Sequence, residues 1–137
     1  MSKTGAAGQS QLPSTTMISR LAFVVWLCVW GWIGVPWNSF QATPSFRRVE
    51  LIPFAITGAQ TQVLNLLAFV PLGMLGVRLG WRPGKILLVG AGLSGITEVM
   101  QLFSTTRYPS TTDFVLNTSG ALAGMTIMNY SIAQWRH

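Results

Sequence analysis

The chain has 137 residues, of which 50% are hydrophobic and only 9% are charged. A soluble domain carries about 25% charged residues, so this composition excludes an ordinary water-facing globular surface. The remaining charge is basic, with nine Lys and Arg against three Asp and Glu. Because these charges stand singly between long apolar runs and form no patch, they favour a membrane protein over one that binds nucleic acid.

Metal and redox chemistry are limited by the counts of two residue types. The chain has one cysteine, Cys28, and one histidine, His137. A single thiol forms no internal disulfide, and one thiol with one imidazole makes no zinc site. We therefore expect no metal and no cofactor.

The N-terminal part divides into a polar tail and an apolar run. Residues 1–16 are rich in Gly, Ser, Gln and Thr and predict a disordered tail. The apolar run at 17–35, interrupted by Arg20, has about the ~20 residues that a bilayer-spanning helix needs. A cleaved signal peptide is the alternative interpretation of this run. Pro36 and Trp37 crowd the place where a small-residue cleavage site would lie, which disfavours it.

Three further apolar runs predict membrane helices, at residues 63–79, 86–103 and 114–130. Pro71 lies in the first of them, and a proline is tolerated in a membrane helix where neighbours satisfy the freed carbonyl. We predict an all-α fold, an integral membrane bundle of four transmembrane helices over residues 17–130. Residues 131–137 form a short C-terminal tail in this prediction.

The last predicted helix carries the small-residue repeat Gly120-x-x-x-Gly124. Repeats of this kind let helix backbones approach closely in lipid. Packing within one chain is the favoured interpretation, and a contact with a second copy or a membrane-protein partner is the alternative.

Basic residues in the short loops predict the orientation in the membrane. With a cytoplasmic N-terminus, six of them lie on the cytoplasmic side: Lys3, Arg20, Arg78, Arg82, Lys85 and Arg136. Three lie on the outer side: Arg47, Arg48 and Arg107. This bias predicts a multi-pass protein of the inner or plasma membrane with both termini in the cytoplasm.

Polar residues inside the predicted helices are the candidates for function, because charged side chains in a membrane are costly. Glu98 lies at helical spacing from Ser94 and Gln101, which puts all three on one helix face. Asp113 and Asn117 share a face of the next helix in the same way.

In the predicted topology these residues meet near the outer membrane surface, together with a residue of the second helix and one of a loop. The candidate site comprises Asn65, Ser94, Glu98, Gln101, Arg107, Asp113 and Asn117. One interpretation is a hydrogen-bonded lock in which Arg107 pairs with Glu98 or Asp113. The other is a shallow polar pocket in which Arg107 holds an anionic headgroup.

Four segments in order resemble the VanZ-like family of small bacterial membrane proteins, named for a teicoplanin-resistance accessory protein. Residues 51–54 (LIPF) are similar to the family's loop element, and 65–73 (NLLAFVPLG) to its Asn-x-x-x-Phe-x-Pro-x-Gly helix. Residues 94–101 (SGITEVMQ) resemble its Ser-x-x-x-Glu-x-x-Gln helix. Arg107 and then 113–120 (DFVLNTSG) resemble its closing element. Glu50 is a departure, since Asn is more usual there.

The resemblance implies a role at the cell envelope and, for the namesake, lowered susceptibility to a lipid-tailed glycopeptide. It implies no settled reaction, since family likeness does not supply a mechanism. Our leading hypothesis is a non-enzymatic envelope protein, in contact with membrane lipids, whose outer-facing pocket binds an amphiphile or a lipid-linked headgroup.

Two alternatives stay open. One is a membrane enzyme acting on a lipid-linked substrate, with Glu98 and Asp113 as acid and base. It is disfavoured because no nucleophile stands beside a base in the sequence. The other is a structural or assembly subunit whose Gly120 and Gly124 face meets a partner. A transporter is the least favoured class, because no polar path crosses the predicted bundle.

Overall fold

The protein is a bundle of antiparallel helices, seen here in a computed structural model that describes residues 14–54 and 58–135. Its elements are α1 (Thr15–Gly34), the short 3₁₀ helix η1 (Trp37–Ser39), α2 (Ala59–Arg78), α3 (Pro83–Leu102) and α4 (Thr111–Gln134). The described residues contain no strand, only two isolated bridges between loops. The all-helical fold expected from the sequence is confirmed. Most of the tail predicted at 1–16 lies outside the described residues, as does the end of the tail predicted at 131–137.

Three stretches are long and apolar enough to cross a membrane: Thr15–Ser39, Gln60–Arg78 and Pro83–Leu102. They correspond to the first three predicted spans. The fourth, α4, does not qualify by composition, although its 24 residues would extend about 36 Å. Its first half is rich in polar residues, two of which, Thr112 and Asn117, are buried within the bundle. The helix therefore hides polar groups against its neighbours α2 and α3.

The contact between α2 and α4 is built on glycine. A Cβ placed on Gly120 would lie 2.0 Å from the carbonyl oxygen of Leu66, and one on Gly124 would lie 2.0 Å from that of Val70. No side chain fits there, so the two backbones touch directly. The small-residue repeat therefore serves packing within the chain. The partner-binding role that the structural-subunit hypothesis gave this face is not available, because α2 occupies it.

The connection between α2 and α3 is a tight glycine turn. Gly80 has a φ of 70°, in the left-handed region that favours glycine. The N–H of Gly80 donates to Val77 O at 2.9 Å, and that of Trp81 donates to Gly76 O at 2.9 Å. These two bonds form a Schellman motif, which ends α2. Pro83 then begins α3 at a position where a missing N–H costs nothing. We call this end of the bundle, with the start of α1, the turn end.

The buried core is small. The outer faces of the helices, which have no protein neighbours, carry apolar side chains that stay exposed. The core comprises Phe69, Leu72, Ile86 and Ala121, from α2, α3 and α4. Helix α1 reaches it through three aromatic side chains, those of Phe23, Trp26 and Trp30. Trp26 also donates from Nε1 to the carbonyl oxygen of Ala68 on α2 at 2.9 Å. Thus α1 is attached to the bundle by side chains, whereas α2 and α4 meet along their backbones.

Candidate functional site

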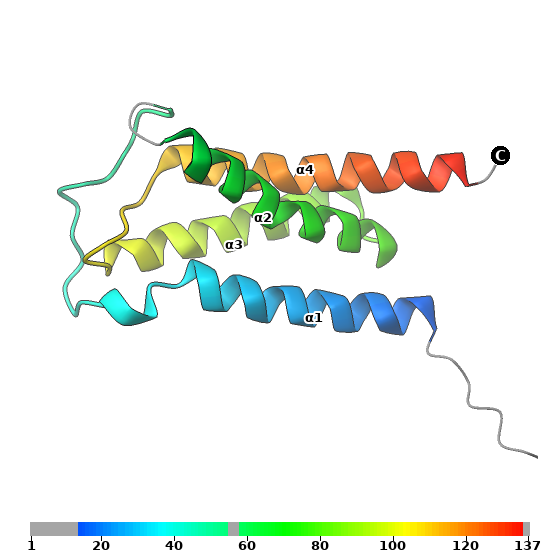
Figure 1. The fold of residues 1–137 in the computed structure, drawn as a ribbon, viewed down its shortest axis with the longest axis horizontal. Helices are drawn as coiled ribbons and strands as arrows, with labels where there is room; N and C mark the ends of the chain where they lie inside the picture. Colours follow the sequence, from blue (N-terminus) through cyan, green and yellow to red (C-terminus); the bar gives the residue numbers. More distant parts are fainter. Residues whose placement is uncertain (1–13, 55–57, 136–137) are drawn as a thin grey trace, which may run out of the picture.

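Two loops cross at the end of the bundle opposite the turn end, which we call the loop end (Figure 1). The α1–α2 loop runs over the end of α3 and the start of α4. The backbone N–H of Gln41 donates to Phe103 O at 2.7 Å, and that of Ser45 donates to Leu102 O at 2.8 Å. Further along, Glu50 N donates to Pro109 O at 2.9 Å. This crossing holds the α1–α2 loop against the polar helix ends.

All three acidic residues of the chain lie at this end of the bundle: Glu50, Glu98 and Asp113. Glu98 Oε2 accepts the backbone N–H of Ser110 at 2.6 Å. Glu50 Oε2 accepts the hydroxyl of the same Ser110 at 2.9 Å. Asp113 lies close enough to act electrostatically on Glu98, and Glu50 on Asp113. Ser110 therefore bridges a carboxylate of α3 and one of the α1–α2 loop.

Two amide side chains complete this group, which we call the polar cluster: Glu50, Asn65, Glu98, Gln101 and Asp113. Asn65 comes from α2, and its side chain lies within interaction range of Asp113. Gln101 stands at the end of α3 and is only 6% exposed. Helices α2, α3 and α4 thus each contribute polar groups at the loop end of the bundle.

Among the residues that the structure describes, four buried atoms of the polar cluster have no hydrogen-bond partner: Asn65 Nδ2, Glu98 Oε1, Gln101 Oε1 and Asp113 Oδ1. Two of these atoms, on Asn65 and Asp113, belong to side chains that interact with each other as donor and acceptor, so a small shift would pair them. A buried polar group left unpaired costs about 1–3 kcal/mol, and buried groups in proteins are generally satisfied. Glu98 Oε1 and Gln101 Oε1 are then the two atoms that lack a donor among the described residues.

Ser94 and Asn117 lie one helical turn deeper and satisfy each other. Asn117 Nδ2 donates to Ser94 Oγ at 2.9 Å, and the two residues are 5% and 0% exposed. The bond joins α4 to α3 inside the bundle. These two predicted site residues thus form a closed structural link beneath the polar cluster.

Arg107 lies apart from the cluster. Its backbone N–H donates to Ser104 Oγ at 3.0 Å, its side chain is exposed, and its charge acts on Asp113 through space. It lines a separate open cavity of about 360 Å³, formed with Trp32 and the residues around η1. The hydrogen-bonded lock predicted from the sequence therefore uses other donors. The backbone N–H and hydroxyl groups of residues 110–112 hold the carboxylates of Glu98 and Glu50, where the sequence predicted the guanidinium of Arg107.

Sequence reasoning missed three residues of this site: Glu50, Ser110 and Thr112. Thr112 Oγ1 donates to Glu50 Oε1 at 3.4 Å and accepts the backbone N–H of Phe54 at 2.7 Å. One feature of the sequence could have pointed to Glu50: it is one of only three acidic residues in the chain. Its loop position hid its role, since helical spacing says nothing about where a long loop returns.

Within residues 14–54 and 58–135, no three His, Cys, Asp or Glu side chains are grouped so that they could hold a metal ion.

Comparison with known proteins identifies a family. The sequence model described as VanZ/LLP1 matches residues 17–133, which includes all four long helices except the ends of α1 and α4. Comparison with curated proteins and with solved structures gives no match.

Proposed function

The chain belongs to the VanZ/LLP1 family, and from that premise we propose that it is a non-enzymatic protein of the cell membrane that binds the polar headgroup of an amphiphile at its loop end. The polar cluster carries this proposal. Its unpaired atoms come from three helices, and the family match covers all three. The ligand is amphiphilic in this proposal because the cluster stands at one end of apolar helices, where a headgroup meets acyl chains.

The chemistry of the unpaired atoms selects the headgroup. Apart from the facing pair of Asn65 and Asp113, the unpaired atoms are two oxygens, on Glu98 and Gln101. A headgroup rich in N–H and O–H groups, such as an amino sugar, supplies the missing donors. A phosphate supplies only acceptors and would meet three carboxyl groups. This reverses the anionic headgroup expected from the sequence, because that expectation rested on Arg107.

The binding test uses two amphiphiles with one tail: a dodecyl glycoside of glucosamine and dodecyl phosphate. The full chain in lipid nanodiscs is expected to bind the amino sugar in preference to the phosphate. Gln101→Leu should weaken that binding by about tenfold, the equivalent of ~1.4 kcal/mol for one buried acceptor. Gln134→Leu is the matched control, since Gln134 is exposed at the far end of α4. Equal affinity for both amphiphiles, or equal loss in both variants, would contradict the proposal.

The envelope location depends on which way the bundle faces. Four basic residues of the described part lie at the turn end: Arg20, Arg78, Arg82 and Lys85. Three lie at the loop end: Arg47, Arg48 and Arg107. This bias supports a cytoplasmic turn end and an outer-facing polar cluster.

Thiol labelling in intact cells tests the orientation. In a Cys28→Ser background, single cysteines go at Thr43 in the α1–α2 loop and at Gly84 beside the turn, both exposed. A membrane-impermeant reagent should label Thr43→Cys and spare Gly84→Cys. The opposite pattern would turn the polar cluster toward the cytoplasm and defeat the envelope role.

Lowered susceptibility to teicoplanin, a lipid-tailed glycopeptide, is the finer form of this proposal. Expression in a sensitive strain is expected to raise the inhibitory concentration, and Glu98→Gln to remove the effect at equal protein abundance. Arg47→Ala serves as the comparison, because Arg47 is an exposed loop residue that does not belong to the polar cluster. If the Glu98→Gln protein protected as well as the unchanged protein, the polar cluster would have no part in resistance.

A membrane enzyme is the second candidate, because Glu98 and Asp113 lie within electrostatic reach of each other. They would then act as acid and base on a lipid-linked substrate. Ser110 also donates its hydroxyl to Glu50, but Ser110 is only 6% exposed, which does not suit a nucleophile that must meet a substrate. Altered lipid-linked intermediates in a deletion strain would favour the enzyme, and an unchanged set would favour binding alone.

A further inference from the structure

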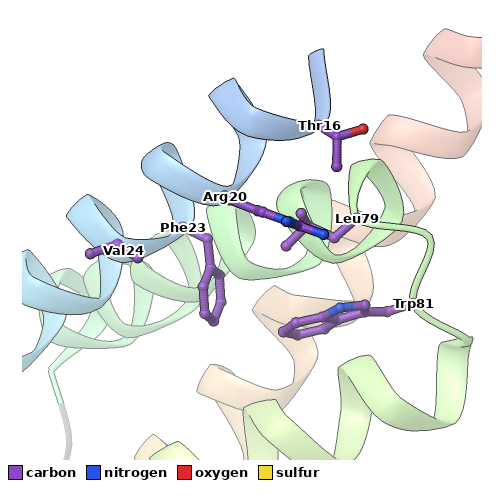
Figure 2. A pocket seen from close by; sticks show the side chains of 6 residues that line it. All are labelled: Thr16, Arg20, Phe23, Val24, Leu79 and Trp81. Atoms are coloured by element: carbon purple, nitrogen blue, oxygen red, sulfur yellow. The ribbon is translucent and has the colours of Figure 1, made fainter. Parts of the chain in front are cut away.

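A second cavity lies at the turn end, far from the polar cluster. It measures about 290 Å³ and is lined by Thr16, Arg20, Phe23, Val24, Leu79 and Trp81. Figure 2 shows Arg20 reaching from α1 toward the α2–α3 turn, with the rings of Phe23 and Trp81 beside it. The cavity therefore sits between the outermost helix and the turn that joins the next two.

The wall of this cavity changes from polar to apolar along α1, from the start of the helix toward its middle. Thr16 and Arg20 come from the first turns of α1, and Phe23 and Val24 follow one turn deeper. The Phe23 ring meets the Trp81 ring edge-on, with centroids 5.3 Å apart. Tryptophan and arginine are typical of the level where lipid headgroups meet acyl chains. A lipid lying here would place its headgroup at Arg20 and its chains along Phe23.

Among the described side chains, none beside this cavity carries a carboxylate to balance its positive charge. Lys85 Nζ stands 4.4 Å from the centre of the Trp81 ring, and Arg82, the N-cap of α3, follows Trp81 in the chain. The three acidic side chains of the chain, Glu50, Glu98 and Asp113, all belong to the polar cluster at the loop end. The cations at the turn end therefore need counterions that this chain's side chains do not supply.

We propose that this cavity binds an anionic glycerophospholipid, with Arg20 holding the phosphodiester and Phe23, Val24 and Leu79 lining the path of an acyl chain. An arginine guanidinium offers paired N–H donors that match two phosphate oxygens, and Lys85 adds a point charge. Thr16 supplies a further hydroxyl donor. A zwitterionic lipid has the same phosphodiester, but its ammonium group would enter a cationic site and be disfavoured.

The bound lipid would also fasten α1. This helix buries only Ser19 and reaches the bundle through a few aromatic side chains. A phospholipid between Arg20 and Trp81 adds contacts to both α1 and the α2–α3 turn. Occupancy of the cavity should therefore raise the thermal stability of the whole bundle, because a ligand stabilises the state that binds it.

The test is a titration of the purified full-length protein with dioleoylphosphatidylglycerol, followed by native mass spectrometry. Arg20→Gln should weaken binding by about tenfold, since it removes the charge-assisted bonds. Arg78→Gln is the matched control, an exposed arginine at the same end that does not line the cavity. Thr16→Val, at the exposed rim, should weaken binding by about threefold and guards against an Arg20 effect on insertion.

Three outcomes would overturn the proposal. The first is equal loss of phosphatidylglycerol binding in Arg20→Gln and Arg78→Gln, which would mean that general positive charge attracts the lipid. The second is equal affinity for dioleoylphosphatidylcholine. The third is displacement by inorganic phosphate alone, which would make the site an anion site without a place for acyl chains. None of these outcomes touches the polar cluster, so the proposed function is tested separately.

Discussion

The contact between α2 and α4 differs in kind from the contact between α1 and α2. In the first, glycines bring two backbones together, and the Leu66 and Val70 carbonyls occupy the places where side chains would stand. In the second, the rings of Phe23, Trp26 and Trp30 bridge the helices. Backbone contact leaves no freedom to adjust, whereas side chains can change rotamer and fill a gap differently. The inner pair should therefore tolerate far less change than the outer helix.

The largest effect is expected for Gly120→Ala in the α2–α4 contact. Its Cβ would lie 2.0 Å from Leu66 O, so the two backbones must separate. We expect a loss of about 3 kcal/mol of stability, at the upper end of ordinary overpacking. Unfolding in mixed micelles with increasing dodecyl sulfate, followed by circular dichroism, measures it.

Gly95→Ala is the matched control, on a face of α3 where a Cβ meets nothing within 4 Å. It should change stability by less than about 1 kcal/mol and in the stabilising direction, since alanine is the better helix former. Similar losses in the two variants would mean that glycine matters for flexibility and not for close approach.

An intermediate effect is expected at the buried bond between α3 and α4. Asn117→Leu removes the donor to Ser94 and should cost about 1–2 kcal/mol, in the range for polar links between membrane helices. A double-mutant cycle with Ser94→Ala in the same unfolding assay isolates the bond. The double variant should lose less than the sum of the single variants, and strict additivity would show that the two side chains do not interact.

The smallest effect is expected at the outer contact. Trp26→Phe removes the bond from Nε1 to Ala68 O but keeps a ring beside Phe69, whose centroid lies 5.9 Å away. A loss of roughly 0.6 kcal/mol is the average for such a bond between membrane helices. Trp32→Phe makes the same change at a side chain that is 77% exposed, and should cost nothing measurable. If Trp26→Phe cost as much as Gly120→Ala, the contrast between the two contacts would be wrong.

The prediction of the candidate site was good where helices carry it and poor where loops do. The i, i+4 spacings of Ser94 from Glu98 and of Asn117 from Asp113 put both residues one turn below the carboxyl groups, where Asn117 bonds to Ser94, because helical geometry repeats every few residues. Arg107 and Glu50 belong to loops. Their places follow from the crossing of residues 39–50 with residues 102–111, which depends on hydrogen bonds between segments far apart in the chain.

The sequence by itself determined the helices and their order. Apolar runs of about twenty residues form helices in lipid, because their backbone groups must bond to one another there. Gly80 and Pro83 mark the turn between α2 and α3 in the sequence. Only the tertiary structure decided which face each helix presents to another. It turned Gly120 and Gly124 toward α2, brought Glu50 to Ser110, left Arg107 outside the polar cluster, and set Arg20 beside Trp81. The physical reason is that hydropathy records whether a residue leaves water, whereas packing partners are chosen by the fit of surfaces distant in sequence.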